Sequence, residues 1–234
     1  MSMATLYIVA TPIGNLGDMT LRALEVLKEV DIILCEDTRV TKKLLNHYGI
    51  KKETLSYHSH SGLTKVNTII NLLTDGKNLA LVSDAGTPGI SDPGTVLVGR
   101  VREEVPGAKI IVIPGPSALT AALSLSGFPS SDFLFLGFLP HKKGREKLFK
   151  EITVSARTSV FYESPHRILK TLSTLAQYLG ENRHVAVARE LTKIYESFVF
   201  GSPGKVLQHF VEHIEEQRGE FVLMVAGASK STEK

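Results

Sequence analysis

The segment of residues 83–94 constrains the fold of this chain more than any other. Its sequence, Ser-Asp-Ala-Gly-Thr-Pro-Gly-Ile-Ser-Asp-Pro-Gly, directly follows the apolar run 79–82. A short apolar run that ends in glycine and proline is typical of a buried strand. Since ligands bind at the carboxyl ends of strands in open α/β sheets, the segment predicts a ligand loop at that edge. The alternative is a plain surface turn; the length of the segment and its two aspartates favour the ligand loop.

The composition is that of an ordinary globular chain. Of its 234 residues, 43% are hydrophobic and 22% are charged, which is ample for one large domain or two small ones. The apolar stretches are too short to span a membrane, and the start of the chain lacks the pattern of a secretory signal. A single cysteine, Cys35, excludes a disulfide framework and a thiolate metal cluster. We therefore expect a cytoplasmic protein with no membrane segment.

The spacing of apolar residues predicts two α/β domains. In the first half, strand-like runs alternate with helical patterns, which indicates a mostly parallel sheet covered on both faces. In the second half, the strands expected at 184–188 and 197–200 have little between them, so we expect antiparallel pairing within a mixed sheet. The turn-rich connector 127–131 predicts a first domain over residues 1–127 and a second over residues 128–234.

Two Ser-Pro pairs in the second half predict helix starts. A serine before a helix can accept a hydrogen bond from a free backbone N–H group, and proline is favoured at the first helical position. Ser164-Pro165 and Ser202-Pro203 have this pattern, and helical apolar spacing follows each pair. We expect one helix to begin at each of them.

Two further strand ends break into proline and glycine. The first expected strand runs into Thr11-Pro12-Ile13-Gly14, and a later one into Pro114-Gly115-Pro116-Ser117. Neither dinucleotide-binding nor triphosphate-binding glycine patterns are present, whereas an adenosine compound without phosphates remains compatible. A plain turn is the alternative for the first loop, and a helix cap at Ser117 is the alternative for the second. Because parallel strands end at one edge, we expect the three loops to lie side by side and to form a ligand site.

Six segments together resemble the tetrapyrrole methylase superfamily and, within it, the branch that methylates ribosomal RNA. They are spread between Leu6 and Gly227, at residues 11–16, 36–39, 83–94, 114–116, 161–167 and 189–193. The resemblance implies two α/β domains with S-adenosylmethionine in the cleft between them, and a homodimer. It also implies methylation of the 2′-hydroxyl of a cytidine ribose in the decoding region of 16S rRNA, in the small ribosomal subunit.

The first loop separates this chain from the members that modify tetrapyrroles. Those members carry a G-x-G-P-G type of loop, where this chain has Ala10-Thr11-Pro12-Ile13-Gly14. A corrinoid or porphyrin substrate is therefore disfavoured. Two alternatives to the RNA methyltransferase stay open, namely a methyltransferase for a small molecule or tetrapyrrole and a non-catalytic ribosome-binding protein.

The resemblance also implies which residues bind the cofactor. The loops that contact the methionine and adenosine parts of the cofactor in the superfamily match these positions: Pro12, Gly14, Asp84, Ala85, Gly86, Thr87, Ser117 and Ala118. For the acceptor side, the resemblance implies no residue.

Charged residues near strand ends are the candidates for catalysis. A ribose hydroxyl is a poor acid, so a nearby base or cation would lower the barrier. The candidates are Glu36, Asp37, Asp84, Glu163, Glu190 and Lys193, and we select Glu163, Glu190 and Lys193 as the catalytic set. For each carboxylate, an ion pair with a neighbouring arginine is the alternative.

Basic residues follow several of the expected strands and favour an RNA partner. Lysine and arginine supply most of the sequence-independent affinity for nucleic acid through phosphate contacts. We expect RNA contacts from Arg39, Lys142, Lys143, Arg145, Arg167 and Arg189. The alternative for any one cluster is a solvated surface, and the formal net charge of +3 is weak evidence by itself. The histidines form no ligand-like cluster, so no metal is expected.

Overall fold

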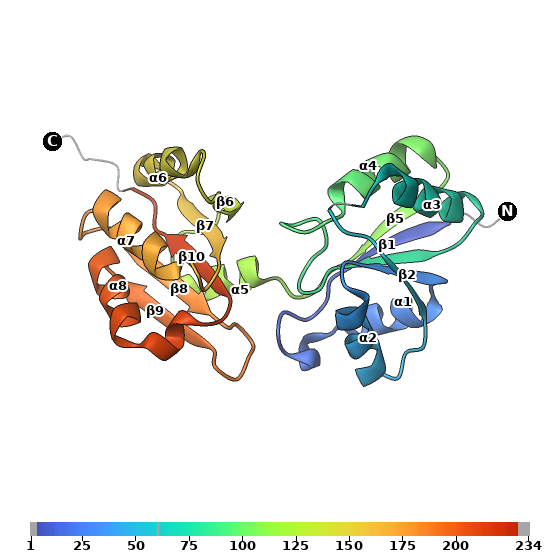
Figure 1. Cartoon of the computed structure of the whole chain (residues 1–234), viewed down its shortest axis with the longest axis horizontal. Helices are drawn as coiled ribbons and strands as arrows, with labels where there is room; N and C mark the ends of the chain where they lie inside the picture. Colours follow the sequence, from blue (N-terminus) through green and yellow to red (C-terminus); the bar gives the residue numbers. More distant parts are fainter. Residues whose placement is uncertain (1–3, 60, 229–234) are drawn as a thin grey trace. The chain divides into compact units, whose positions relative to one another are not determined.

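The computed structural model describes residues 4–59 and 61–228 and contains two α/β units, Met1–Ser117 and Ala118–Lys234. Each unit has its own five-stranded sheet (Figure 1). The division lies before helix α5 (Ala118–Ser126), whereas the sequence placed it after that helix. The expected fold class, a parallel sheet in the first part and a mixed sheet in the second, is confirmed.

All strand pairs in the sheet of the first unit are parallel, in the order β3-β2-β4-β1-β5. The strands are β1 (Thr5–Val9), β2 (Ile32–Cys35), β3 (Glu53–Ser56), β4 (Leu79–Val82) and β5 (Lys109–Ile113). The last residue of β1, Val9, lies opposite Val82 of β4 and Ile113 of β5. The strands β4, β1 and β5 therefore end at the same level, side by side.

Helices cover both faces of this sheet. The helices are α1 (Leu21–Glu29), α2 (Thr38–His47), α3 (Leu63–Thr74) and α4 (Thr95–Glu104), and a 3₁₀ helix, η1 (Leu16–Asp18), precedes α1. Figure 1 shows α1 and α2 on one side of the sheet and α3 and α4 on the other. Alternate residues of β2 face opposite ways, so that Ile33 and Cys35 join the core under α1 and α2, and Leu34 joins the core under α3 and α4. Burial on both faces explains why β2 and β4 are apolar throughout.

The sheet of the second unit is mixed, in the order β6-β7-β10-β8-β9. The strands are β6 (Phe133–Phe138), β7 (Thr158–Glu163), β8 (Val185–Arg189), β9 (Ser197–Gly201) and β10 (Phe221–Val225). β6 and β7 are parallel, and the other neighbours, including β8 and β9, are antiparallel. The predicted antiparallel pair is thus confirmed.

Three helices pack on one face of the second sheet. They are α6 (Arg145–Val154), α7 (Ile168–Tyr178) and α8 (Pro203–Glu212), and the 3₁₀ helix η2 (Ile214–Gln217) follows α8. Phe149 of α6, Phe161 of β7 and Phe210 of α8 lie in their common core, while α5 contacts β10. Figure 1 shows α5 on the side of the sheet away from α7 and α8.

One of the two predicted helix starts is confirmed. The Ser202 side chain accepts a hydrogen bond from Lys205 N, and α8 begins directly after it. The start at Ser164 is wrong, because Arg167 N donates to Ser164 O at 3.0 Å in a turn and α7 begins at Ile168. The Ser164 N–H group donates instead to the Glu163 carboxylate, at 2.9 Å. Ser164 therefore lies in a turn next to the Glu163 carboxylate, and the helix begins after this turn.

Candidate functional site

The three proline- and glycine-rich loops are joined to one another at the carboxyl edge of the first sheet. Thr11 N donates to Gly86 O at 2.9 Å, and Gly86 N donates to Thr11 O at 3.0 Å. Thr87 Oγ1 donates to Pro116 O at 3.4 Å, which ties the loop after β4 to the loop after β5. The expectation that the three loops lie side by side is confirmed.

Buried hydroxyl groups and glycines shape the loops from within. Thr11 Oγ1 donates to Ser83 O at 3.0 Å, and Ser83 Oγ donates to Gly86 O at 3.0 Å. Gly86 has φ +83°, a conformation that side chains other than glycine rarely adopt. A Cβ atom on Gly115 would lie 3.0 Å from Ala10 Cβ, so the strand ends approach closely there. The backbone of the edge is thus held by hydrogen bonds within and between the loops.

Three carboxylates gather at this edge. Glu36 follows β2, and Asp84 and Asp92 lie in the loop after β4; within residues 4–59 and 61–228, no lysine or arginine pairs with any of them. Burial and the charge of Asp84 raise the pKa of Glu36. Burial, and then the charges of Glu36 and Asp84, raise the pKa of Asp92 to about 6. The edge therefore carries negative charge that a cationic ligand would balance.

Asp37 caps a helix and connects two strand ends. Its carboxylate accepts from Arg39 N at 2.8 Å at the start of α2 and pairs with the Arg39 guanidinium at 2.6 Å. The Arg39 side chain and backbone hold the pKa of Asp37 at about 2. The Asp37 N–H group donates to Asp84 Oδ1 at 3.1 Å, which positions the Asp84 carboxylate. Asp37 thus follows the ion-pair alternative rather than the catalytic one.

The residues predicted to bind the cofactor share this edge, with one exception. Gly14, Asp84 and Ala85 are exposed, Pro12 and Gly86 are buried beneath them, and Thr87 and Ser117 are half-buried. Ala118 is the first residue of α5 and belongs to the second unit. The set fits S-adenosylmethionine, because this molecule carries a sulfonium and an ammonium cation and the edge offers carboxylates without basic partners.

Glu163 is the centre of a buried polar cluster in the second unit. Its side chain is 0% exposed, with Oε1 at 2.6 Å from Arg167 Nη2 and Oε2 at 3.4 Å from Arg145 Nη2. Thr171 Oγ1 also donates to Oε2, at 2.6 Å. The contacts of this carboxylate are thus to side chains of the second unit. The geometry gives Glu163 a structural role in place of the predicted catalytic one.

Three of the arginines predicted to contact RNA hold backbone segments instead. Arg167 Nη1 donates to Leu139 O at 2.8 Å, and Arg145 Nη1 donates to Pro140 O at 3.3 Å. The buried Arg189 donates to three carbonyl oxygens, those of Arg218, Tyr195 and Glu215. Their geometry does not support the predicted RNA contacts, because their guanidinium groups are engaged within the second unit.

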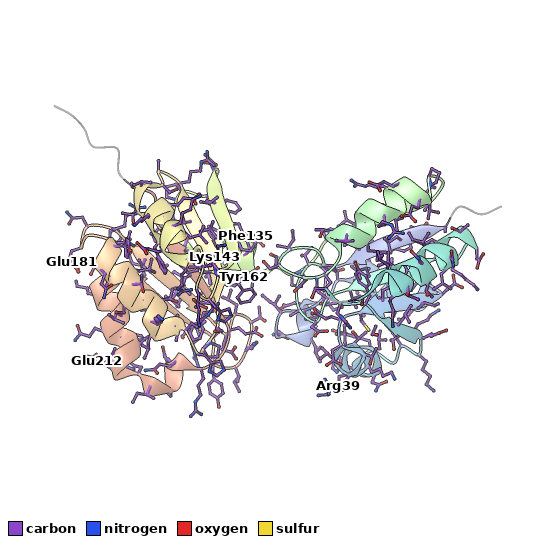
Figure 2. The ribbon with its side chains drawn as sticks, turned by 45° about the horizontal axis from the view of Figure 1, so that its top comes forward. Arg39, Phe135, Lys143, Tyr162, Glu181 and Glu212 are labelled. Carbon is purple, nitrogen blue, oxygen red and sulfur yellow. The ribbon has the colours of Figure 1, made fainter. Side chains whose placement is uncertain are left out.

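The other three basic candidates lie on the surface. Arg39 of the first unit has an 86% exposed side chain, and Lys142 and Lys143 of the second unit are exposed. Arg39 and Lys143 are labelled in Figure 2. Exposed cations of this kind remain available for phosphate groups.

Glu190 and Lys193 form an ion pair in the loop between β8 and β9. Lys193 Nζ donates to Glu190 Oε1 at 2.8 Å and to Glu220 Oε2 at 3.0 Å. Burial acts to lower the pKa of Lys193, but these bonds outweigh it and raise the pKa. Burial acts to raise the pKa of Glu190, but the bonds to Lys193 and to Glu220 N outweigh it and lower the pKa. Both groups stay charged at neutral pH, so neither is tuned as a general base.

Backbone strain is concentrated in two of the loops that the sequence singled out. In the described part of the chain, the non-glycine residues with positive φ are Ser91 at 61°, Glu190 at 49° and Thr192 at 67°. Each such conformation costs free energy and persists where the surroundings impose it, which is common at functional sites. At Gly219, a Cβ atom would lie 2.5 Å from Glu190 Cγ, so the absence of a side chain there makes room for Glu190.

Residues 4–59 and 61–228 contain neither a metal-binding cluster nor a membrane-spanning helix. No group of histidine, cysteine, aspartate or glutamate side chains there has an arrangement that could hold a metal ion. No helix in the same residues is both long enough and apolar enough to cross a membrane.

Comparison with known proteins identifies the family. The model of the tetrapyrrole (corrin/porphyrin) methylases matches residues 5–207, so the chain belongs to this family. The chain is therefore a methyltransferase, and the methyl donor is S-adenosylmethionine. Among solved structures, the methyltransferase CobJ superposes with a TM-score of 0.68 at 19% identity, over 96% of this chain and 95% of that one. This likeness confirms the fold.

Within the family, two similar curated proteins carry the same name. Ribosomal RNA small subunit methyltransferase I of Escherichia coli O157:H7 is 49% identical over 228 residues, which cover 97% of this chain and 79% of that protein. The protein of the same name from Thermotoga maritima is 46% identical over 225 residues, covering 96% of this chain and 99% of that protein. The resemblance inferred from the sequence motifs is thus confirmed.

Two features of the structure were not predicted from the sequence. Asp92 was noted as part of its loop, but its burial beside Glu36 and Asp84 depends on how the loop folds back. The exposure of Phe138 was not expected, because the residue belongs to an apolar run that predicts a regular strand. A signal was present there, because a glycine inside a strand pattern, Gly137, is typical of a bulge.

Proposed function

We propose that this chain methylates the 2′-hydroxyl of a cytidine ribose in the decoding region of 16S rRNA, in the small ribosomal subunit. The proposal is carried by similarity along nearly the whole chain to relatives named for the small ribosomal subunit RNA. Exposed cations at Arg39, Lys142 and Lys143 support it, as does a sequence pI of about 8.9. From the proposed rRNA substrate we also infer a cytoplasmic location.

The first unit supplies the cofactor site in this proposal. When bound, S-adenosylmethionine supplies an electrophilic methyl group on a sulfonium centre. Asp84 would hold a cationic part of it, since its carboxylate is exposed and is fixed by the Asp37 N–H group at 3.1 Å. The joined loops would hold the rest through backbone groups and the Thr87 hydroxyl, which already donates to Pro116 O. A site fixed before binding contributes to rate mainly by positioning.

The second unit supplies Lys193 for the acceptor side. An ammonium group stabilises the negative charge that develops on a hydroxyl oxygen as it attacks. Glu190 and Glu220 hold the Lys193 ammonium protonated and in place. We therefore assign Lys193 as the catalytic cation and Glu190 as its positioning residue. Glu163 is left out, because its carboxylate is enclosed.

The family resemblance also suggests a homodimer, and the second unit has a surface that suits one. β9 is an edge strand, and edge strands with exposed apolar side chains favour association. Ile194 is 90% exposed and Tyr195 is 70% exposed just before β9, and Phe200 on β9 is 51% exposed. Light scattering on the purified protein should give twice the mass of one chain, and a single-chain mass would contradict the dimer.

The test is methyl transfer with purified components. Small ribosomal subunits from cells that lack the enzyme are incubated with the protein and labelled S-adenosylmethionine, and the RNA is digested to nucleosides. Label in 2′-O-methylcytidine supports the proposal. Subunits from normal cells should take up no label, because their site already carries an unlabelled methyl group. Label in another nucleoside would contradict the assigned reaction. Binding to subunits with no label in the RNA would favour a non-catalytic ribosome-binding protein.

A further inference from the structure

Three aromatic rings form a partly exposed group at the β6 edge of the second sheet. The Tyr162 ring lies 5.2 Å from that of Phe135 and 5.3 Å from that of Phe138, measured between centroids. Phe138 is 57% exposed, and the other two are half-buried. Figure 2 shows Phe135 and Tyr162 together at this edge. We call Phe135, Phe138 and Tyr162 the aromatic platform.

A bulge in β6 creates the platform. Residues three apart in a regular strand point to opposite faces, so Phe135 and Phe138 would not both meet Tyr162. The pairing of β6 with β7 shifts register between Phe135 and Phe138, and Gly137 there has φ +57°. The bulge turns Phe138 outward and leaves the next residue, Leu139, 1% exposed in the core. Bulges that aim a side chain in this way are common next to active sites.

Two exposed lysines follow the platform closely in the chain. Lys142 and Lys143 lie in the turn between β6 and α6, and no carboxylate pairs with either of them among the residues that the structure describes. The preceding backbone is held by the Glu163 cluster, through Arg167 to Leu139 O and Arg145 to Pro140 O. The rings and the start of the turn are thus fixed relative to each other.

We propose that the aromatic platform binds an unpaired base of the RNA substrate by stacking on Phe138, while Lys142 and Lys143 contact the flanking phosphates. This inference rests on the proposed function and assigns residues to its acceptor side. Single-stranded nucleic acid is recognised by aromatic rings next to cations, and bases in a duplex cannot reach such rings. An apolar protein partner would leave the two lysines without counter-charge, so RNA suits the platform better.

The first test compares variants of the Phe138 ring in their binding to a defined probe. The probe is a single-stranded oligoribonucleotide of about 12 nucleotides with a central 2-aminopurine, and its duplex form serves for comparison. Phe138→Ala should weaken single-strand binding by about 10-fold or more, with the salt slope unchanged, and should reduce quenching of 2-aminopurine. Phe138→Trp should retain binding, because the ring is kept. The exposure of Phe138 predicts that both variants fold, which thermal melting checks.

The second test uses the lysines. The double variant Lys142→Gln, Lys143→Gln should reduce the slope of log affinity against log salt by about 1.4, since each contact to a single strand contributes about 0.7. The control is the double variant Lys51→Gln, Lys52→Gln, which removes the same charge from two consecutive lysines of the first unit. If the control reduces the slope of log affinity against log salt equally, the assignment of Lys142 and Lys143 as phosphate contacts is overturned.

The outcomes separate the inference from the proposed function. Methyl transfer by the wild-type protein to small subunits is measured in parallel. If the wild type methylates rRNA and Phe138→Ala binds the single strand as tightly as the wild type, the inference is overturned and the function stands. If Phe138→Ala changes the mass in solution instead of the RNA affinity, the platform is a contact between copies and the inference is overturned. A wild type that methylates no rRNA would overturn the proposed function, and the oligonucleotide alone then decides the inference.

Discussion

Thr11 and Gly86 exchange two backbone hydrogen bonds, at 2.9 and 3.0 Å, across the carboxyl edge of the first sheet. Thr11 follows β1 and Gly86 follows β4, so this bridge makes one surface of two loops that are distant in the chain. Asp84 lies in the bridged loop, two residues before Gly86. A ligand site that is built before the ligand arrives loses less entropy on binding.

The glycine in this bridge should be required for cofactor binding. Gly86→Ala places a side chain at φ +83°, which should cost about 1 kcal/mol or more and distort the loop. Calorimetry with a chelator present should show low-micromolar or tighter binding of S-adenosylmethionine to the wild type, and weaker binding to the variant. Gly99→Ala is the control, since a Cβ atom there meets nothing within 4 Å. If Gly86→Ala binds S-adenosylmethionine as tightly as Gly99→Ala does, the assignment of this loop to the cofactor site is contradicted.

The charge of Asp84 should contribute to cofactor affinity. Asp84→Asn keeps an oxygen that accepts from Asp37 N and removes the charge. It should weaken binding of S-adenosylmethionine by roughly 10- to 150-fold, for a lost bond of about 1.5–3 kcal/mol. The melting temperature should change little, because Asp84 is exposed. The matched control is Asp75→Asn at the end of α3. Unchanged affinity together with a large fall in melting temperature would make Asp84 a structural residue.

Asp92 should make stability fall as pH rises. Its pKa is raised from 3.8 to about 6 in the folded chain, so between these values the folded state binds more protons than the unfolded state. Stability should therefore decrease from about pH 4 to pH 6 and stay reduced above that. Asp92→Asn should be more stable than the wild type at pH 7.5, by roughly 1–2 kcal/mol for this half-buried group. Thermal melts should show this advantage shrinking toward pH 4, and an advantage independent of pH would contradict the assignment.

Glu163 should matter for folding before it matters for catalysis. Glu163→Gln leaves Arg145 and Arg167 without their shared carboxylate, and removal of one partner of a buried ion pair costs about 3–5 kcal/mol. The free energy of unfolding of the second unit, measured in urea, should fall by this amount. Glu146→Gln, which removes an exposed pair with Lys150, should leave the free energy of unfolding nearly unchanged. Full stability with lost methyl transfer would return Glu163 to the catalytic set.

Lys193 should affect turnover through its charge. Lys193→Ala should lower kcat by about 100-fold or more, as expected for a group that stabilises developing negative charge. It should leave the affinity for S-adenosylmethionine unchanged. Lys193→Arg should recover part of the rate, because the charge is kept. If the alanine variant raises KM and leaves kcat intact, Lys193 binds substrate without assisting the reaction.

The sequence predicted the features that local chemistry determines. The loop after β4 was recognisable because glycine and proline at that density end a buried strand, and the capped start of α8 follows from Ser202-Pro203. The edge strand β3 was missed because its residues, Glu-Thr-Leu-Ser, are partly exposed and lack an apolar run. Helix α6 was missed because its start lies within a cluster of basic residues.

Features that depend on distant partners could not be predicted. Arg145 and Arg167 look like surface cations in the sequence, and their carboxylate, Glu163, becomes buried only when β7, α6 and α7 pack together. The same packing decides that Lys142 and Lys143 stay exposed. The sequence thus shows where basic residues gather, but it does not separate the arginines that pair with Glu163 from the lysines that stay on the surface.

The central claim is tested most directly by mapping ribose methylation on rRNA in living cells. The gene is deleted and then restored as the wild type or as Asp84→Ala, and 2′-O-methylation is mapped along the small-subunit RNA. We predict that one cytidine in the decoding region loses its 2′-O-methyl group on deletion, regains it with the wild type, and regains little of it with the variant. An unchanged methylation map in the deletion strain would contradict the account.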